Sequence, residues 1–292
     1  MGLRFEALPR VSEAEVAPLE VYPTRDRTLL PVRRYDGPGG SDKTLILLHG
    51  SGYHSRYLAP LAARLARAGA AHVVTPDLRG HGAEPVRRGD VDYIDQLEDD
   101  IADLATYAEQ RHPGTRLVVG GHSSGGGLAV RFAGSRHGER AAGLVLLAPY
   151  LGHDAPTTRS NAGGWARPRL PVIIALSILN GFGITALNGV TAITFDMPEE
   201  ARDGTETLAY SFRLNTGYAP RNHRKDLAAT RAPVLGLIGA DDEAFYAEKL
   251  GPTLASLTEA SVEVIPGVSH LDLPGRPVTA ERIAVWLSRL DN

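Results

Sequence analysis

The stretch that decides the fold is Gly121-His122-Ser123-Ser124-Gly125, a Gly-x-Ser-x-Gly pattern near the middle of the chain. The strand-like run 116–120 precedes it, and a second apolar run, 128–132, follows it. Between a strand and a helix, this pattern is typical of a nucleophile elbow, a tight turn that raises a serine hydroxyl above a sheet. Side chains two residues either side of the serine would collide with the turn, and Gly121 and Gly125 relieve that crowding. The pattern therefore predicts Ser123 as a nucleophile.

Strand-like and helix-like segments alternate on both sides of this turn. Leu58, Leu61 and Leu65 recur at helical spacing, and a last amphipathic helix is predicted over 279–290. Strands that alternate with helices imply a mainly parallel sheet with right-handed crossovers. We therefore expect an α/β fold with an eight-stranded sheet and helices on both faces. The predicted strands are 19–22, 28–34, 44–48, 72–75, 117–119, 144–147, 234–238 and 262–265.

The alternation stops once, between residues 151 and 226. This segment is expected to be an inserted cap, and residues 1–150 and 227–292 are expected to form the core. It contains a polar, helix-like run at 199–214 and a largely apolar stretch at 170–195 with no charge until Asp196. The apolar stretch is long enough to span a membrane, but asparagines, glycines and threonines interrupt it. We expect a surface or pocket-lining element instead, and the cap is a candidate for peripheral membrane contact.

A second helix, predicted around residues 94–104, carries acidic residues on its outer face. These are Asp95, Glu98, Asp99 and Asp103. Acidic side chains suit the first turn of a helix, where the helix dipole is positive. We expect them to form a solvated face rather than a metal site.

The composition excludes several classes of protein. The chain has 292 residues, a net charge of -3 and 43% hydrophobic residues, which is ordinary for a globular protein and too acidic for a nucleic-acid binder. It contains no cysteine, so disulfides, thiol catalysis and cysteine-ligated metals are excluded. The first residues show no signal-peptide pattern, and a cytoplasmic location is the expectation.

A serine nucleophile needs a base within hydrogen-bond distance and an acid that orients the base. In enzymes with this elbow the chain order is serine, acid, histidine, and the last two follow late strands. Among ten histidines, His270 directly follows the last predicted strand. The acid should follow the strand that ends at Gly239, where Asp241 and Asp242 are adjacent. We favour Asp242, the third residue after that glycine, and expect Asp241 to cap the loop.

An acyl-transfer site also needs donors for the developing oxyanion. One is the backbone N–H of the residue after the nucleophile, here Ser124, and the other comes from the loop after an early strand. The loop His49-Gly50-Ser51-Gly52 fits this place, and the N–H of Ser51 is the expected donor.

Together these segments resemble the serine-dependent α/β-hydrolases, in particular the branch of monoacylglycerol lipases and lysophospholipases that is also grouped with serine aminopeptidases. The likeness is carried by 48–57, by Pro76-Asp77-Leu78-Arg79-Gly80-His81-Gly82, by the elbow and by the late Asp242 and His270. It covers roughly 43–149 and 232–290. The resemblance implies an α/β-hydrolase fold, half an oxyanion hole in the first loop and a largely architectural second loop. His49 and His81 are accordingly expected to be structural.

These residues predict a serine carboxylic-ester hydrolase that works through an acyl-enzyme on Ser123. No metal or organic cofactor is expected. The substrate would be a small ester with an apolar acyl or aromatic group, including a lipid. Alternatives that use the same three residues are a thioesterase, an amidase, a C–C hydrolase and an acyltransferase. A non-catalytic binding protein on the same fold is the alternative from another class.

Overall fold

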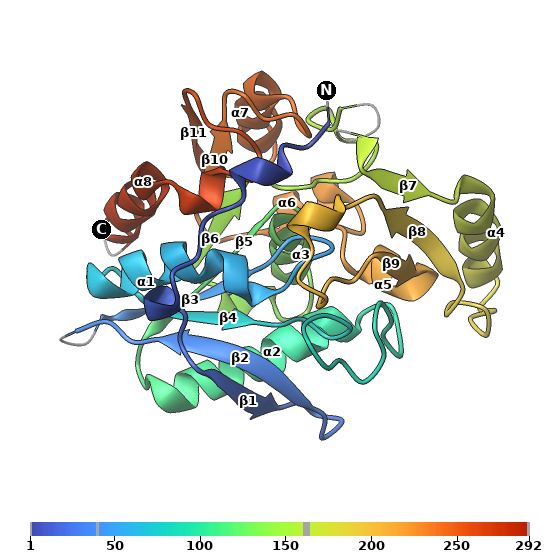
Figure 1. Ribbon diagram of the computed structural model, residues 1–292, viewed down its shortest axis with the longest axis horizontal. Coiled ribbons are helices and arrows are strands. Elements are labelled where there is room, and N and C mark those ends of the chain that lie inside the picture. The colour runs from blue at the N-terminus through green and yellow to red at the C-terminus, as the bar shows by residue number, and fades with distance from the viewer. Residues whose placement is uncertain (1, 39–40, 160–163, 291–292) are drawn as a thin grey trace.

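The large sheet forms the centre of the protein, as a computed structural model of residues 2–38, 41–159 and 164–290 shows (Figure 1). Within these residues the strands form two sheets, one of eight strands and one of three. The order in the large sheet is β1-β2-β4-β3-β5-β6-β10-β11. Its strands are β1 (Leu19–Pro23), β2 (Leu29–Tyr35), β3 (Lys43–Leu48), β4 (His72–Pro76), β5 (Arg116–His122), β6 (Gly143–Leu147), β10 (Val234–Gly239) and β11 (Ala260–Ile265).

Only the β1 end of this sheet is antiparallel. β1 pairs with β2, and β2 pairs with β4, in the antiparallel sense, whereas the strands from β4 across to β11 are all parallel. The expected mainly parallel sheet of eight strands is confirmed. Every residue of β3, β4, β6 and β10 is buried, because helices cover both faces of the sheet. The carboxyl ends of the parallel strands share one edge of the sheet.

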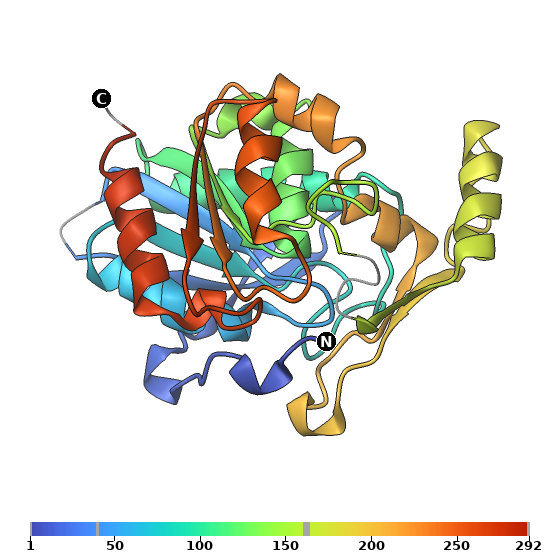
Figure 2. The same ribbon diagram turned by 90° about the horizontal axis from the view of Figure 1, so that it is seen from above.

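Helices form a layer on each face of the large sheet (Figure 2). α1 and α8 pack against each other on one face, α3 packs against α2 and α6 on the other, and α7 packs against β10 and β11. The helices are α1 (Ala59–Arg67), α2 (Gln96–Arg111), α3 (Ser124–Ala133), α6 (His223–Ala229), α7 (Ala247–Ala255) and α8 (Pro277–Leu287). Short 3-10 turns are η1 (Phe5–Ala7), η2 (Glu13–Glu15), η3 (Ser55–Leu58), η4 (Gly138–Arg140), η6 (Glu199–Ala201) and η7 (Leu273–Gly275).

Of the four acidic residues expected to form a solvated face around α2, Glu98 and Asp99 are buried instead. Glu98 forms ion pairs with Arg131 and Arg221, and Asp99 Oδ1 lies 2.9 Å from His137 Nε2. The expectation was wrong for these two residues because their partners come from segments far from α2 in the sequence, where helical spacing gives no sign of them.

The segment between β6 and α6 contains the small sheet, in the antiparallel order β7-β8-β9. The apolar stretch predicted at 170–195 divides into a helix and a strand, because Gly183 turns the chain with φ 77° after the helix ends. The prediction of a helix-like run at 199–214 was wrong, because these residues form a 3-10 turn, a strand and the start of a short helix. The elements are β7 (Ala166–Pro168), α4 (Leu170–Gly181), β8 (Thr191–Phe195), β9 (Ala209–Ser211) and α5 (Phe212–Gly217).

No helix in the described part of the chain is both long enough and apolar enough to cross a membrane. α4 is the most apolar of the helices, but it has only 12 residues. About 20 residues are needed to span the hydrocarbon core of a bilayer.

Candidate active site

Ser123 occupies the turn between β5 and α3 with a strained backbone. Its φ of 56° and ψ of -121° lie in a region that residues with a side chain avoid. A Cβ on Gly121 would lie 2.3 Å from the carbonyl carbon of Gly125, and a Cβ on Gly125 would lie 2.4 Å from the Leu48 carbonyl oxygen. Neither distance is sterically allowed, so both positions of the pentapeptide require glycine.

The structure brings His270 and Asp242 to this serine. Ser123 Oγ lies 3.0 Å from His270 Nε2, and His270 Nδ1 lies 2.8 Å from Asp242 Oδ2. Asp242 follows β10 and His270 follows β11, both parallel to β5, so the three residues meet at the carboxyl edge of the sheet. The histidine and the aspartate are almost completely buried, whereas Ser123 is partly exposed.

Of the two adjacent aspartates, the structure places Asp242 and not Asp241 against the histidine. Asp242 Oδ1 accepts hydrogen bonds from the backbone N–H groups of Ala244 at 2.8 Å and Phe245 at 2.7 Å. These bonds leave Oδ2 directed at His270. The Asp241 side chain is exposed, and its backbone carbonyl accepts a hydrogen bond from Arg4. The local hydrogen bonds therefore fix one carboxylate oxygen and present the other.

Glu243 is a residue of this site that sequence reasoning missed. Its Oε2 accepts a hydrogen bond from the backbone N–H of His270 at 2.9 Å. Its Oε1 accepts from the backbone N–H of Arg4 at 2.9 Å and lies 3.2 Å from Arg4 Nε. The buried carboxylate thus ties the His270 backbone to the loop that holds Asp242. The only sequence signal was the run of three acids at 241–243, because the Arg4 partner lies at the other end of the chain.

The loop after β3 lies beside Ser123 with one backbone donor unused. A Cβ on Gly50 would be 3.2 Å from Ser123 Cβ. Gly50 N–H donates to the Tyr57 hydroxyl at 2.8 Å, and Gly52 N–H donates to the Tyr210 hydroxyl at 2.7 Å. Within the described residues the Ser51 N–H between them has no hydrogen-bond acceptor.

Ser124 lies across from this loop at the first position of α3. A residue at that position has no acceptor for its N–H within its own helix. The Ser51 hydroxyl donates to the Ser124 hydroxyl at 2.7 Å, so the two serines are directly joined. Ser51 and Ser124 thus each carry a backbone N–H without an acceptor among the described residues, and their side chains are in contact.

A buried chain of polar groups connects this loop to His270. Tyr57 OH accepts from Gly50 N–H and donates to His122 Nδ1 at 3.0 Å. His122 Nε2 then donates to the His270 carbonyl oxygen at 3.1 Å. Burial lowers the pKa of His122 well below its ordinary value, and the nearby His270 lowers it further. The ring is therefore neutral, with its proton on Nε2.

His49, the first residue of the same loop, and the nearby His81 form buried hydrogen bonds that hold the loop in place. Leu78 N–H donates to His49 Nε2 at 3.1 Å, so His49 Nδ1 carries the proton and donates to the Gly50 carbonyl at 2.9 Å. Burial lowers the pKa of His49 to about 4. His81 Nε2 lies 2.7 Å from the Tyr210 hydroxyl, and burial also lowers its pKa.

The segment with the small sheet reaches this loop through aromatic residues. Thr207 N–H donates to the Gly52 carbonyl at 3.0 Å, and a Cβ on Gly52 would lie 3.3 Å from Trp165. Trp165 stacks on Phe195 with ring centres 4.6 Å apart, and Phe195 contacts Tyr210 edge to face. The segment between β6 and α6 is therefore anchored on the loop that carries Ser51.

This arrangement agrees with a match of residues 39–271 to the protein family described as serine aminopeptidase, S33. The chain belongs to this S33 family. A monoacylglycerol lipase of Mycolicibacterium smegmatis is 24% identical to this chain over 261 residues, which cover 83% of this chain and 87% of that relative. Human monoglyceride lipase is 33% identical over 119 residues, 40% of this chain and 39% of the relative.

Solved structures of the same architecture cover nearly all of the S33 chain. A soluble variant of the Saccharomyces cerevisiae monoglyceride lipase, in complex with a substrate analog, has a TM-score of 0.71 at 17% identity and covers 97% of this chain and 98% of its own. The Paleococcus ferrophilus monoacylglycerol lipase has a TM-score of 0.65 at 20% identity, over 89% and 98%. The expected α/β-hydrolase fold is confirmed. This member of the S33 family is a hydrolase of the lipase and esterase type.

Proposed function

We propose that the protein is a serine carboxylic-ester hydrolase in which Ser123 is the nucleophile, His270 the general base and Asp242 the residue that orients the base. The observation that carries this proposal is the continuous hydrogen-bonded path from a strained serine to a buried carboxylate, 3.0 Å and then 2.8 Å long. A serine hydroxyl is a weak nucleophile until a base takes its proton. This geometry supplies the base and holds it in the required tautomer.

The reaction begins when Ser123 Oγ attacks the ester carbonyl carbon and its proton passes to His270 Nε2. Asp242 stabilises the imidazolium that forms. The N–H groups of Ser51 and Ser124 stabilise the oxyanion, which is the largest single contribution in many acyl-transfer sites. The C–O bond then breaks, and His270 gives its proton to the leaving alcohol. A water molecule, deprotonated by His270, attacks the acyl-enzyme, releases the acid and restores Ser123.

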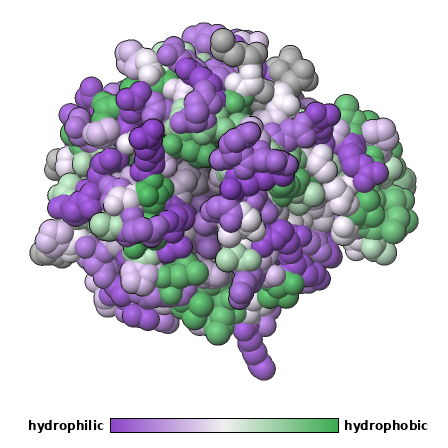
Figure 3. All heavy atoms as spheres, viewed as in Figure 1, coloured by the Kyte–Doolittle hydropathy of each residue, from purple (hydrophilic) through white to green (hydrophobic). Residues whose placement is uncertain are grey.

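The inserted segment, residues 151–226, acts as the cap in this proposal, and its exposed apolar side chains point to the substrate class. Ile174 and Ile178 of α4 are 59% and 57% exposed, and Phe182 after the helix is 80% exposed. Figure 3 shows a hydrophobic area of surface over the region of α4 at one end of the molecule. Exposed apolar clusters of this kind mark contact with a partner or a lipid surface.

We infer that the substrate is an ester with an apolar acyl or aromatic group, with monoacylglycerols as the leading candidates. Relatives named monoacylglycerol lipase support this choice. The apolar face of α4 would rest on the lipid surface from which such a substrate comes, in the manner of an interfacial helix.

A fluorophosphonate probe tests the nucleophile directly. The probe phosphonylates activated serines, so the folded wild-type protein should be labelled within minutes. Ser123→Ala should abolish labelling, whereas Ser124→Ala keeps the backbone N–H and should still be labelled. Absence of labelling in folded wild-type protein, or labelling that persists in Ser123→Ala, contradicts the proposal.

A series of p-nitrophenyl esters from acetate to decanoate tests the substrate class. The proposal predicts that kcat/KM rises with acyl length, because each buried CH₂ contributes about 0.8 kcal/mol. A strict preference for acetate would rule out the proposed apolar acyl substrate, but it would not contradict the proposal that Ser123 is the nucleophile. Matched thioesters and amides decide between ester hydrolysis and the other reactions of the same three residues.

A further inference from the structure

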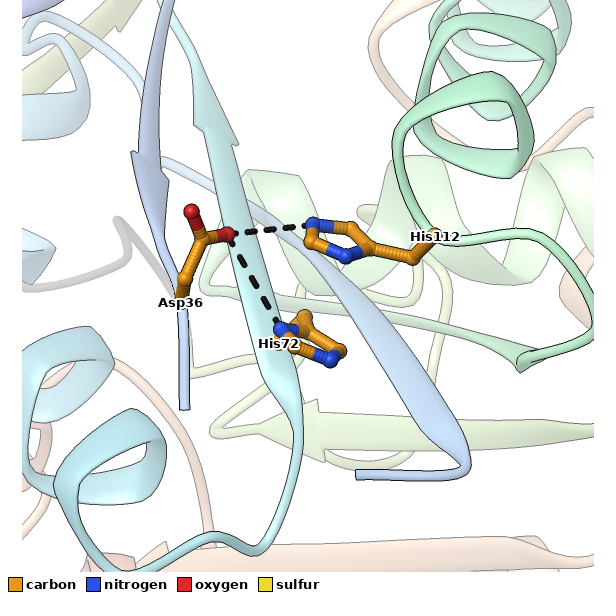
Figure 4. A group of neighbouring side chains, drawn as sticks. All are labelled: Asp36, His72 and His112. Atoms are coloured by element: carbon orange, nitrogen blue, oxygen red, sulfur yellow. Dashed lines mark ion pairs between the residues drawn. The ribbon is translucent and has the colours of Figure 1, made fainter. Parts of the chain in front are cut away.

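Three side chains with metal-binding atoms meet at the edge of the large sheet away from Ser123 (Figure 4). Asp36 follows β2, His72 is the first residue of β4, and His112 directly follows α2. His72 lies at the amino end of a parallel strand, whereas Ser123 lies at the carboxyl end of another. The two groups of residues are therefore on opposite edges of the sheet, and the ester-hydrolase proposal does not use this one.

The distances in this cluster fit one metal ion. His112 Nε2 lies 3.1 Å and His72 Nδ1 lies 3.8 Å from the same atom, Asp36 Oδ1. The three atoms all lie within 4.8 Å of one another. Tetrahedral Zn²⁺ with bonds of about 2.0 to 2.1 Å separates its ligands by about 3.3 to 3.4 Å. The observed separations lie on either side of that value, so small side-chain movements complete the geometry.

The histidine nitrogens that face Asp36 are buried and have no other partner among the described residues. His72 is 7% exposed. His112 Nε2 lies within hydrogen-bond distance of Asp36 Oδ1, whereas His72 Nδ1, at 3.8 Å, forms no hydrogen bond with any residue that the structure describes. Buried polar atoms nearly always have a partner, and an exception needs an explanation. Two buried nitrogens aimed at one carboxylate oxygen, as Figure 4 shows, are the donor set of a cation site.

One oxygen of the Asp36 carboxylate contacts an arginine, and the other faces the two histidines. Arg34 contacts Asp36 Oδ2 and also Glu20, so its charge is shared between two carboxylates. This contact holds the carboxylate and leaves Oδ1 toward the histidines. The Asp36 side chain is 46% exposed, which gives water access to a fourth ligand position.

The two imidazole rings stack with centres 3.8 Å apart and planes 12° apart. A metal ion binds a histidine nitrogen in the plane of its ring, so parallel rings cannot both bind it without tilting. Rotation of either ring about its Cβ–Cγ bond gives that tilt, and this torsion is soft.

We propose that Asp36, His72 and His112 form a binding site for a divalent transition-metal ion, best matched by Zn²⁺ with water as the fourth ligand. Two imidazoles and one carboxylate suit Zn²⁺, Fe²⁺ and Co²⁺, whereas Mg²⁺ and Ca²⁺ take oxygen ligands. The ion would join the end of β2, the start of β4 and the end of α2. Its binding energy would therefore add to the stability of the fold.

Calorimetric titration of untagged, metal-free protein with Zn²⁺ tests this site. We expect one Zn²⁺ per chain, and a visible d–d absorption typical of tetrahedral coordination when Co²⁺ replaces it. His112→Gln and Asp36→Asn should each weaken Zn²⁺ binding by about tenfold or more. His153→Ala, which removes an exposed histidine outside the cluster, should bind Zn²⁺ as the wild type does.

A thermal unfolding scan supplies an independent readout. Zn²⁺ should raise the Tm of the wild type and of His153→Ala but not that of His112→Gln, and Mg²⁺ should raise none of them. Circular dichroism and esterase activity show that each variant is folded, because the site lies away from Ser123. The proposal is overturned if the wild type binds no Zn²⁺ up to about 100 µM, or if both cluster variants bind it equally well.

Discussion

The carboxyl edge of the large sheet and the inserted segment are built in opposite ways. At the edge, the Asp242 carboxylate accepts two backbone hydrogen bonds and lies 2.8 Å from His270, which Glu243 fixes through its backbone. In the inserted segment, α4 fully buries only Leu176 and leaves Ile174 and Ile178 exposed. In the first region the acidic side chains and the histidine all have hydrogen-bond partners within the protein. In the second region the exposed apolar side chains belong to no apolar core among the described residues.

This difference separates two properties of the enzyme. Hydrogen bonds in a buried, dry site fix the positions of the reacting groups, so changes there should lower kcat for every ester. Apolar side chains exposed on α4 contribute only when an apolar surface covers them, so changes there should affect apolar substrates alone.

The largest effect is expected for Asp242→Asn. The amide carries no charge that could stabilise an imidazolium, and its NH₂ group can donate to His270 Nδ1 and hold the ring in the wrong tautomer, so the loss in kcat should be about 10⁴-fold for all esters. Asp241→Asn is the matched control, because its side chain is exposed, and it should change kcat by less than about twofold. Steady-state kinetics on p-nitrophenyl butyrate measures both. Equal losses in the two variants would remove the distinction between the neighbouring aspartates.

A smaller loss is expected for Glu243→Ala. Without this acceptor the His270 backbone N–H is unpaired and the imidazole is less well placed, which should lower kcat by about 10- to 100-fold with little change in KM. Glu243→Gln keeps an acceptor oxygen and should recover most of the activity. Glu248→Ala, at an exposed position of α7, is the control. If Gln is as damaging as Ala, the hydrogen bond to His270 is not the reason for the loss.

Replacing apolar residues of α4 should affect only one class of substrate. The double variant Ile174→Ser and Ile178→Ser should bind phosphatidylcholine vesicles, and hydrolyse monoacylglycerol in them, about tenfold less well. Its kcat on soluble p-nitrophenyl butyrate should not change. Val285→Ser, which alters an exposed apolar residue of α8, should behave as the wild type in both assays. A loss on the soluble ester would mean that α4 supports the active site itself.

The smallest predicted effect concerns pH and the buried histidines of the carboxyl edge. The pKa of folded His122 lies well below its ordinary value because of burial. On acidification the unfolded chain therefore takes up this proton first, and stability falls as pH decreases below about 6.5. Between pH 7.5 and 5.5 the wild type should therefore lose on the order of 1 kcal/mol more of its free energy of unfolding than His122→Asn does. Urea unfolding at the two pH values measures the difference, and equal losses in both proteins would contradict it.

The same comparison explains what the sequence could predict. Strands such as β3 and β10 are continuous apolar runs because both faces of the sheet are covered, and that pattern is local. The elbow could be predicted for the same reason, since the clashes that require Gly121 and Gly125 arise within a few residues or with the adjoining strand.

The features that sequence reasoning missed depend on contacts between distant segments. Glu98 is buried because Arg131 and Arg221 reach it, and Glu243 is held by Arg4 from the other end of the chain. The division of residues 170–195 into α4 and β8 was missed because an exposed apolar helix has no polar face to mark its period. Such features need the tertiary structure.

The most direct test of the central claim is the site of the acyl-enzyme. Trypsin cleavage after Arg116 and Arg131 releases the peptide 117–131, which contains both Ser123 and Ser124. After a rapid acid quench of the reaction with a p-nitrophenyl ester, tandem mass spectrometry locates the acyl group within that peptide. The proposed function predicts acylation at Ser123 alone. An acyl group on Ser124 or on another peptide, from enzyme that is turning over, would contradict it.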